Sequence, residues 1–136
     1  ITWSGENMRL SGLDNIRWVV EDALKFVKRE VKRGAIYQGI ILDPPAYGRG
    51  PDGEKWILED QIDEIIGLCS KILDVDRNFF ILNLYSMGFS PLIAETILKT
   101  HFKKTEPPEY GELFVEDNFN KKLPLGIYAR FSNIKG

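Results

Sequence analysis

The feature that most constrains the fold is a short apolar strand that ends on an acid and two prolines. Residues 40–42 are consecutive large aliphatic residues, a pattern typical of a strand buried on both faces. Asp43, Pro44 and Pro45 follow at its carboxyl end. Each proline fixes its φ angle at about −65° and restricts the residue before it, so we expect a stiff loop with unpaired carbonyls. Open α/β sheets bind ligands at this edge, so the pattern predicts a ligand site here.

The rest of the chain alternates between predicted helices and strands. Ser90 and Pro91 are typical of a helix start, and Gly34 of a helix end. We expect the last two strands, residues 112–115 and 126–131, to form an antiparallel hairpin, and the segment between Asp43 and Gly53 to be a loop. The order indicates a doubly wound α/β sheet with an antiparallel edge. We predict helices over residues 1–10, 23–33, 59–73 and 91–100, and strands over residues 15–20, 40–42, 78–84, 112–115 and 126–131.

Composition limits the classes of function. The length of 136 residues predicts a single domain, and a net charge of −2 argues against strong autonomous binding to nucleic acid. Cys69 is the one cysteine and His101 the one histidine, so we expect no disulfide and no metal site. A protein without disulfides is typical of the reducing cytoplasm, where we expect this one to act. No apolar run approaches the ~20 residues of a membrane span, so we expect no membrane partner.

The motif Asp43-Pro44-Pro45, with Tyr47 close behind, resembles the fourth motif of class I S-adenosylmethionine-dependent methyltransferases. The wider sequence through Trp56 is similar to the branch that contains the large-subunit ribosomal RNA methyltransferases. The resemblance covers about residues 2–131. It implies a Rossmann-like methyltransferase sheet with a C-terminal antiparallel hairpin. It also implies S-adenosylmethionine as cofactor and RNA as substrate, with RNA methylation taking place during rRNA processing.

The resemblance also implies that part of the domain is absent. The third to seventh strands of the family are matched, whereas the first strand, with its glycine-rich turn, and the second are not. We therefore expect residues 1–136 to be the C-terminal portion of a methyltransferase catalytic domain, a piece of a longer chain. The strand ending at Leu42 loses a neighbour, so we expect it to pair with residues 15–20, with a second copy in a homodimer, or with residues upstream.

Glu21, Asp22 and Ala23 lie between a predicted strand and a helix. Taken alone, Asp22 is a typical N-cap residue. The resemblance implies that Glu21, Asp22 and Ala23 contact the cofactor, with the acid accepting the adenine amino group and the next backbone amide donating to the ring. The two roles can share one carboxylate, so both stay open.

Asp43, Pro44, Pro45 and Tyr47 are the predicted catalytic residues. A strand-end carboxylate is costly to bury without a partner, which favours function over a simple turn. By resemblance, Asp43 and the Pro44 carbonyl line the pocket where methyl donor and acceptor meet, and Asp43 also contacts the cofactor. Tyr47 either stacks on a target base or covers the core.

Charged and aromatic residues follow in the same loop. Arg49 and Lys55, with Tyr47, are the predicted substrate-binding residues, because either cation can meet a phosphate. Solvated surface charges are the alternative for both. We interpret Trp56 as a packing residue rather than a base reader.

The cysteine bears on the reaction type. Cys69 lies on the apolar face of a predicted helix, which predicts a buried, inert thiol. In the resembling branch, cytosine-5 transfer uses a cysteine in the turn where this chain has Tyr85, so we expect transfer to nitrogen or oxygen by another mechanism. The position of His101 near a helix end indicates a favourable interaction with the helix dipole rather than a catalytic role. The alternative function is a catalytically inactive nucleotide-binding or interaction fragment.

Overall fold

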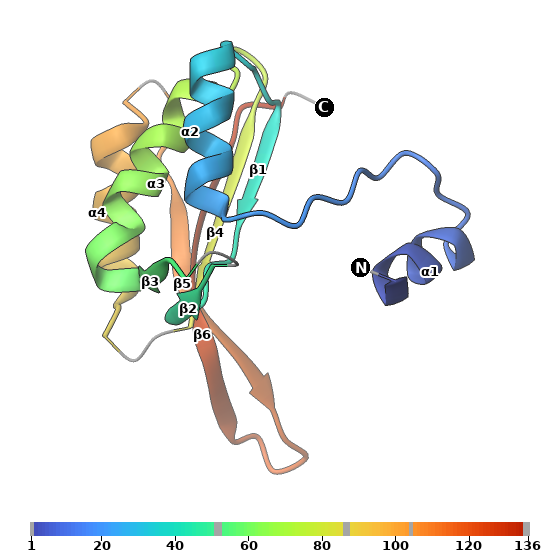
Figure 1. The fold of residues 1–136 in the computed structure, drawn as a ribbon. Coiled ribbons are helices and arrows are strands. Elements are labelled where there is room, and N and C mark those ends of the chain that lie inside the picture. Colours follow the sequence, from blue (N-terminus) through green and yellow to red (C-terminus); the bar gives the residue numbers. More distant parts are fainter. Residues whose placement is uncertain (1, 51–52, 86–87, 104, 135–136) are drawn as a thin grey trace.

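The computed structural model describes residues 2–50, 53–85, 88–103 and 105–134. Figure 1 shows helices packed along one face of a sheet, with a hairpin projecting from one end and a separate helix at the N-terminus. The helices are α1 (Thr2–Leu10), α2 (Ala23–Arg33), α3 (Leu58–Ile72) and α4 (Pro91–His101), and the strands are β1 (Gly39–Leu42), β2 (Tyr47–Arg49), β3 (Lys55–Ile57), β4 (Phe79–Leu84), β5 (Glu109–Glu116) and β6 (Lys122–Ser132).

The main sheet has the strand order β1-β4-β6-β5. β1 runs parallel to β4, with Leu42 opposite Leu82, whereas β6 is antiparallel to both β4 and β5. This mixed sheet with a terminal hairpin confirms the predicted α/β fold class. The predicted doubly wound arrangement is not present in the described residues, because α2, α3 and α4 all pack on one face of the sheet (Figure 1). Among the described residues, no helix has both the length and the hydropathy that crossing a membrane requires.

The core lies between the sheet and helices α2, α3 and α4 (Figure 1). Alternate residues of β4 point into it, because successive side chains of a strand face opposite sides. Phe80, Leu82 and Leu84 are each buried, and Phe80 packs against the rings of Phe102 and Phe131. Cys69 is buried on the apolar face of α3, which confirms its predicted place in the core.

The predicted helix ends are confirmed. Asp22 caps α2 by accepting a hydrogen bond from Lys25 N at 2.8 Å, and Gly34 closes the helix in the left-handed region with φ of 65°. Ser90 caps α4 in the same way, with Pro91 in its first turn. Local capping chemistry therefore determines where these helices begin and end.

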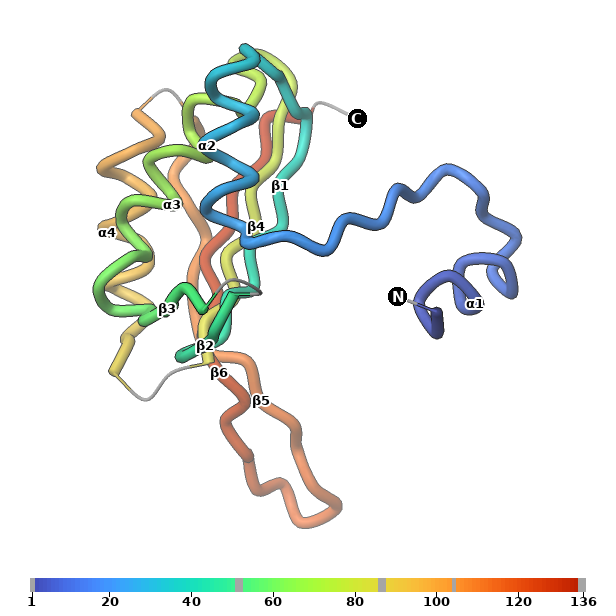
Figure 2. Tube along the Cα trace, in the orientation of Figure 1, coloured from blue at the N-terminus to red at the C-terminus, as the bar shows by residue number. Residues whose placement is uncertain are grey.

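The predicted strand at residues 15–20 is wrong. These residues belong to no strand, and the chain runs outward from α2 to α1, away from the sheet (Figure 2). The apolar side chains of Ile16, Trp18, Val19 and Val20 are 40–75% exposed. A strand exists only through ladder hydrogen bonds, and the described residues place no partner beside this segment.

The prediction of a fully buried strand at residues 40–42 is also wrong. Ile41 is 69% exposed, and β1 pairs with β4 alone among the described strands. Direct pairing with residues 15–20, one of three expected ways to cover the edge of β1, is therefore absent. Pairing with a second copy or with further residues stays a prediction.

The segment predicted as a loop after Pro45 contains a small hairpin. β2 pairs antiparallel with β3, with Gly48 opposite Trp56. The Trp56 indole nitrogen donates to the Pro45 carbonyl at 2.6 Å. The expectation of unpaired carbonyls in the proline loop is therefore wrong for Pro45. Trp56 is half-buried and packs against the core, in line with its predicted packing role. Residues 51 and 52 of this segment lie outside the described residues.

We predict that the Cys69 thiol is unreactive in the folded protein. Burial raises its pKa to about 12, so the reactive thiolate is scarce at neutral and mildly alkaline pH. A chromogenic disulfide reagent at mildly alkaline pH should label the native protein far more slowly than the protein in denaturant. Rapid stoichiometric labelling of native protein would contradict the burial of this thiol.

We also predict that Tyr37 contributes to stability through Glu30. The Tyr37 hydroxyl donates to the buried Glu30 carboxylate at 2.8 Å, and this bond, helped by Arg33 and Arg29 and opposed by burial, lowers the pKa of Glu30 below its ordinary value of 4.5. A lowered carboxylate pKa stabilises the fold above the unfolded-state pKa, and the contribution is lost as the pH falls through the folded-state pKa.

Tyr37→Phe should therefore lower the free energy of unfolding at neutral pH and make its decline toward acid pH shallower. Urea unfolding at a series of pH values measures both effects, with Tyr110→Phe, a partly exposed tyrosine of β5, as the matched control. Identical pH profiles for Tyr37→Phe and the wild type would rule out this contribution.

Candidate functional site

A cleft of about 310 Å³ opens where β1 ends and α2 begins. One wall comes from the segment entering α2, another from the loop after β1, and a third from the β2–β3 hairpin. The lining residues are Val20, Glu21, Asp22, Ala23, Leu24, Leu42, Asp43, Pro44, Pro45, Gly48, Arg49, Gly50, Trp56 and Ile65. The cleft therefore lies at the carboxyl end of β1, the edge at which the sequence predicts a ligand site.

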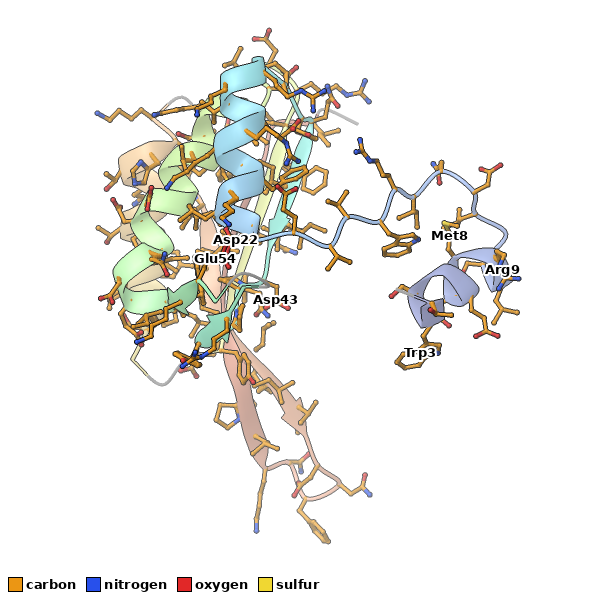
Figure 3. The ribbon with its side chains drawn as sticks, viewed as in Figure 1. Trp3, Met8, Arg9, Asp22, Asp43 and Glu54 are labelled. Carbon is orange, nitrogen blue, oxygen red and sulfur yellow. The ribbon has the colours of Figure 1, made fainter. Side chains whose placement is uncertain are left out.

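The cleft unites two groups of predicted site residues that are about twenty positions apart in the sequence. Residues 21–23 lie on one side and residues 43–45 on the other. Figure 3 shows Asp22, Glu54 and Asp43 close together beside the start of α2 and the end of β1. The fold thus brings together the residues assigned to the cofactor and those assigned to catalysis.

Asp22 is placed for both of the roles that the sequence left open, the helix cap and the contact with a ligand. Its carboxylate caps α2 through Lys25 N, which confirms the N-cap interpretation, and the residue also lines the cleft. It is half-buried. The neighbouring Glu21 forms an ion pair with Arg29, and this hydrogen bond is the main reason why the pKa of Arg29 is raised.

An ion pair links two walls of the cleft. Lys25 in the first turn of α2 contacts Glu54, which precedes β3. Glu54 also accepts a backbone hydrogen bond, since Gly50 N donates to its carbonyl at 2.9 Å. The hairpin is therefore tied to the helix that carries Asp22.

Asp43 has a partner that the sequence analysis missed. Asn83 of β4 donates from Nδ2 to Asp43 Oδ1 at 2.8 Å. The signal was available, because Asn83 is the one polar residue in the apolar strand Phe79–Leu84. The parallel register places it beside the end of β1.

The two prolines of the motif differ in exposure. Pro44 is buried and Pro45 is exposed, although both line the cleft. The Pro45 carbonyl is committed to Trp56, whereas no hydrogen bond to the Pro44 carbonyl is recorded among the described residues. The Pro44 carbonyl is thus a candidate acceptor for a ligand in the cleft.

The predicted substrate-binding residues are only partly assembled at the cleft. Arg49 lines it and donates from Nε to the Tyr47 hydroxyl at 3.2 Å. Tyr47 is 55% exposed on β2, and neither Tyr47 nor Lys55 is among the lining residues. Tyr47 is also absent from the core, so its ring forms an exposed surface next to the cleft.

The remaining candidates lie outside the cleft. His101 contacts Asp63 at 2.8 Å, joining α4 to α3. Tyr85 is largely exposed after β4, and Cys69 lies within the core. In the part of the chain that the structure describes, no cluster of three or more histidine, cysteine or carboxylate side chains is arranged to bind a metal.

Comparisons with known proteins agree with this architecture. No family model and no curated protein matches the sequence. Among solved structures, a SAM-dependent methyltransferase from Agrobacterium tumefaciens is 30% identical with a TM-score of 0.86, over 97% of this chain and 45% of that chain. The chain thus spans about half the length of that protein.

Two further structures show the same fold at lower identity. A protein assigned as a methyltransferase, SMU.776, complexed with SAH (S-adenosylhomocysteine), is 18% identical with a TM-score of 0.72, over 96% of this chain and 36% of that one. A protein from Streptococcus mutans, assigned as SAM-dependent, is 16% identical with a TM-score of 0.71, over 96% and 35%. The chain therefore has the fold of class I S-adenosylmethionine-dependent methyltransferases, as the resemblance of the motif at residues 43–45 predicts.

Proposed function

We propose that this chain is the C-terminal portion of the catalytic domain of an S-adenosylmethionine-dependent methyltransferase that acts on RNA. The observation that carries the proposal is the cleft at the carboxyl end of β1 that both Asp22 and Asp43 line. The Agrobacterium protein, described as SAM dependent, supports the cofactor assignment through 30% identity over nearly the whole chain.

The residues of the cleft fit the proposed cofactor. Its volume of about 310 Å³ falls within the range of small-molecule sites. Leu24, Leu42 and Ile65 provide apolar walls for a flat ring, and the half-buried Asp22 carboxylate provides an acceptor for an amino group. Asp22 and the Ala23 amide would hold the adenine, and Asp43 would lie nearer the sulfur.

When bound, S-adenosylmethionine supplies a methyl group on a positively charged sulfur. Asp22, Ala23 and Asp43 would hold it so that the acceptor could attack the methyl group in line, with S-adenosylhomocysteine as the leaving product. Such a reaction depends mainly on alignment of the reacting atoms. Carboxylates at the cleft favour the positive charge of the donor.

A nitrogen acceptor suits the groups present. As an amine gains a methyl group it must lose a proton, and the Asp43 carboxylate and Pro44 carbonyl can accept hydrogen bonds from the N–H groups and orient the nitrogen lone pair. The proton leaves to Asp43 or to water. Burial of Cys69 supports a mechanism without a cysteine nucleophile, because the thiol does not line the cleft.

Tyr47 and Arg49 support RNA as the substrate. An exposed tyrosine ring next to the cleft offers a surface on which a base can stack, and Arg49 can meet a phosphate. The net charge of −2 indicates that few basic contacts contribute, so we expect additional affinity from outside this chain. We propose a role in rRNA methylation in the cytoplasm.

The open edge of β1 bears on the assembly. Because β1 pairs with β4 alone among the described strands, its other edge is free to accept a further strand. Either a second copy, giving a homodimer, or further residues of a longer chain would satisfy it. The alternative function, a fragment that binds nucleotide without catalysis, applies to residues 1–136 taken in isolation.

We predict that Asp22→Ser weakens the binding of SAH by about tenfold, equivalent to ~1.4 kcal/mol. Serine caps a helix about as well as aspartate, so α2 should remain stable, but the shorter side chain loses the acceptor in the cleft. Calorimetric titration of the full-length protein with SAH measures the change, and Asp76→Ser, an exposed aspartate outside the cleft, is the matched control. If the wild-type protein released or absorbed no heat at millimolar SAH, the result would contradict the proposed function.

We predict that Tyr47→Ala reduces methyl transfer to RNA while Tyr47→Phe retains it. Loss of one base-stacking contact of about 1–3 kcal/mol should raise the KM for RNA at least fivefold without changing SAH affinity. Transfer of a radioactive methyl group to total RNA from cells that lack the protein measures the effect. An unchanged KM in Tyr47→Ala would show that Tyr47 does not contact the substrate.

A further inference from the structure

Asn83 occupies an unusual position in β4. The strand alternates strictly, with Phe80, Leu82 and Leu84 buried toward the helices. Asn83 therefore faces the opposite side of the sheet, as Ile81 does. It is the last residue of that side before the strand ends, next to the end of β1.

The two ends of the Asn83 amide differ. Nδ2 donates to Asp43 Oδ1 at 2.8 Å, whereas the Asn83 side-chain oxygen is buried and accepts no hydrogen bond from the described residues. Rotating the amide would place its oxygen against the carboxylate, so the contact with Asp43 determines the orientation. A buried amide oxygen without a donor costs free energy.

The fold alone does not explain this residue. A β-branched aliphatic side chain, such as that of Ile81, favours a strand and leaves no unsatisfied oxygen. Asn83 does not cap a helix or close a turn, since it lies within β4. Its recorded side-chain hydrogen bond is the one to Asp43, so this residue relates to the cleft rather than to the core.

We infer that Asn83 is a positioning residue that orients Asp43 for methyl transfer, an inference that rests on the proposed function. Asp43 is exposed at a strand end, where its carboxylate can rotate. By holding Oδ1, Asn83 leaves Oδ2 at a defined position to accept the hydrogen bond of the acceptor amine. Alignment is the main requirement of the reaction, so this constraint acts on the rate of transfer.

The inference predicts opposite effects on stability and activity. Asn83→Val in the full-length protein should keep or raise the melting temperature, because it removes the unsatisfied oxygen. It should bind SAH within about twofold of the wild type, keep the KM for RNA, and lower kcat by about tenfold or more. Asn83→Asp, which has the same shape but no donor, should lose transfer similarly.

Two further variants complete the test. Ile81→Val, on the same side of β4 two residues earlier, is the matched control and should leave kcat unchanged. Asn83→Thr retains a donor on a β-branched side chain and should recover part of the kcat lost in Asn83→Val. The assay uses total RNA from cells that lack the protein and a radioactive methyl donor.

The outcomes separate this inference from the proposed function. Wild-type kcat in Asn83→Val, or a lower melting temperature together with reduced SAH binding, would overturn the positioning role, because either result indicates at most a structural residue. A wild-type protein that neither binds SAH nor methylates RNA would overturn the proposed function and this inference with it. The expected result is a stable, SAH-binding Asn83→Val protein with low kcat.

Discussion

The parallel pairing of β1 with β4 is the constraint on which the candidate site depends. It places the carboxyl ends of both strands at one edge of the sheet, so that Asp43 and Asn83 come within hydrogen-bonding distance although they are forty residues apart. The chain must leave this edge through a loop, and two prolines make that loop stiff. A one-residue slip in register would move Asn83 to the helix-covered side and separate it from Asp43.

The walls of the cleft are held together by contacts that are not part of the sheet. Asp22 both caps α2 and lines the cleft, Lys25 joins α2 to Glu54, and Trp56 holds the Pro45 carbonyl. Helix, hairpin and proline loop are thus connected around one space of about 310 Å³. Asp22 and Trp56 therefore serve both the packing of these elements and the lining of the cleft.

Most helices and the terminal hairpin were predictable, because their signals are local. Asp22, Gly34 and Ser90 determine helix ends through their own backbone and side-chain geometry. The predicted strand at residues 15–20 failed for the converse reason, since a strand exists only if a partner lies beside it. Ile41 shows the same limit, because its exposure depends on which strands flank β1 and not on its hydropathy.

The sequence by itself determined the stiff acidic loop at residues 43–45, which resembles a methyltransferase motif, and the cap at Asp22, since both follow from chemistry within a few residues. It also determined the buried position of Cys69, which follows from the apolar periodicity of its helix. Only the tertiary structure decided that Asp22 and Asp43 share a cleft, that Tyr47 lies outside its lining, and that Asn83 holds Asp43. These facts depend on strand order and register. Strand order and register depend in turn on the summed burial of side chains from distant segments, which no local pattern specifies.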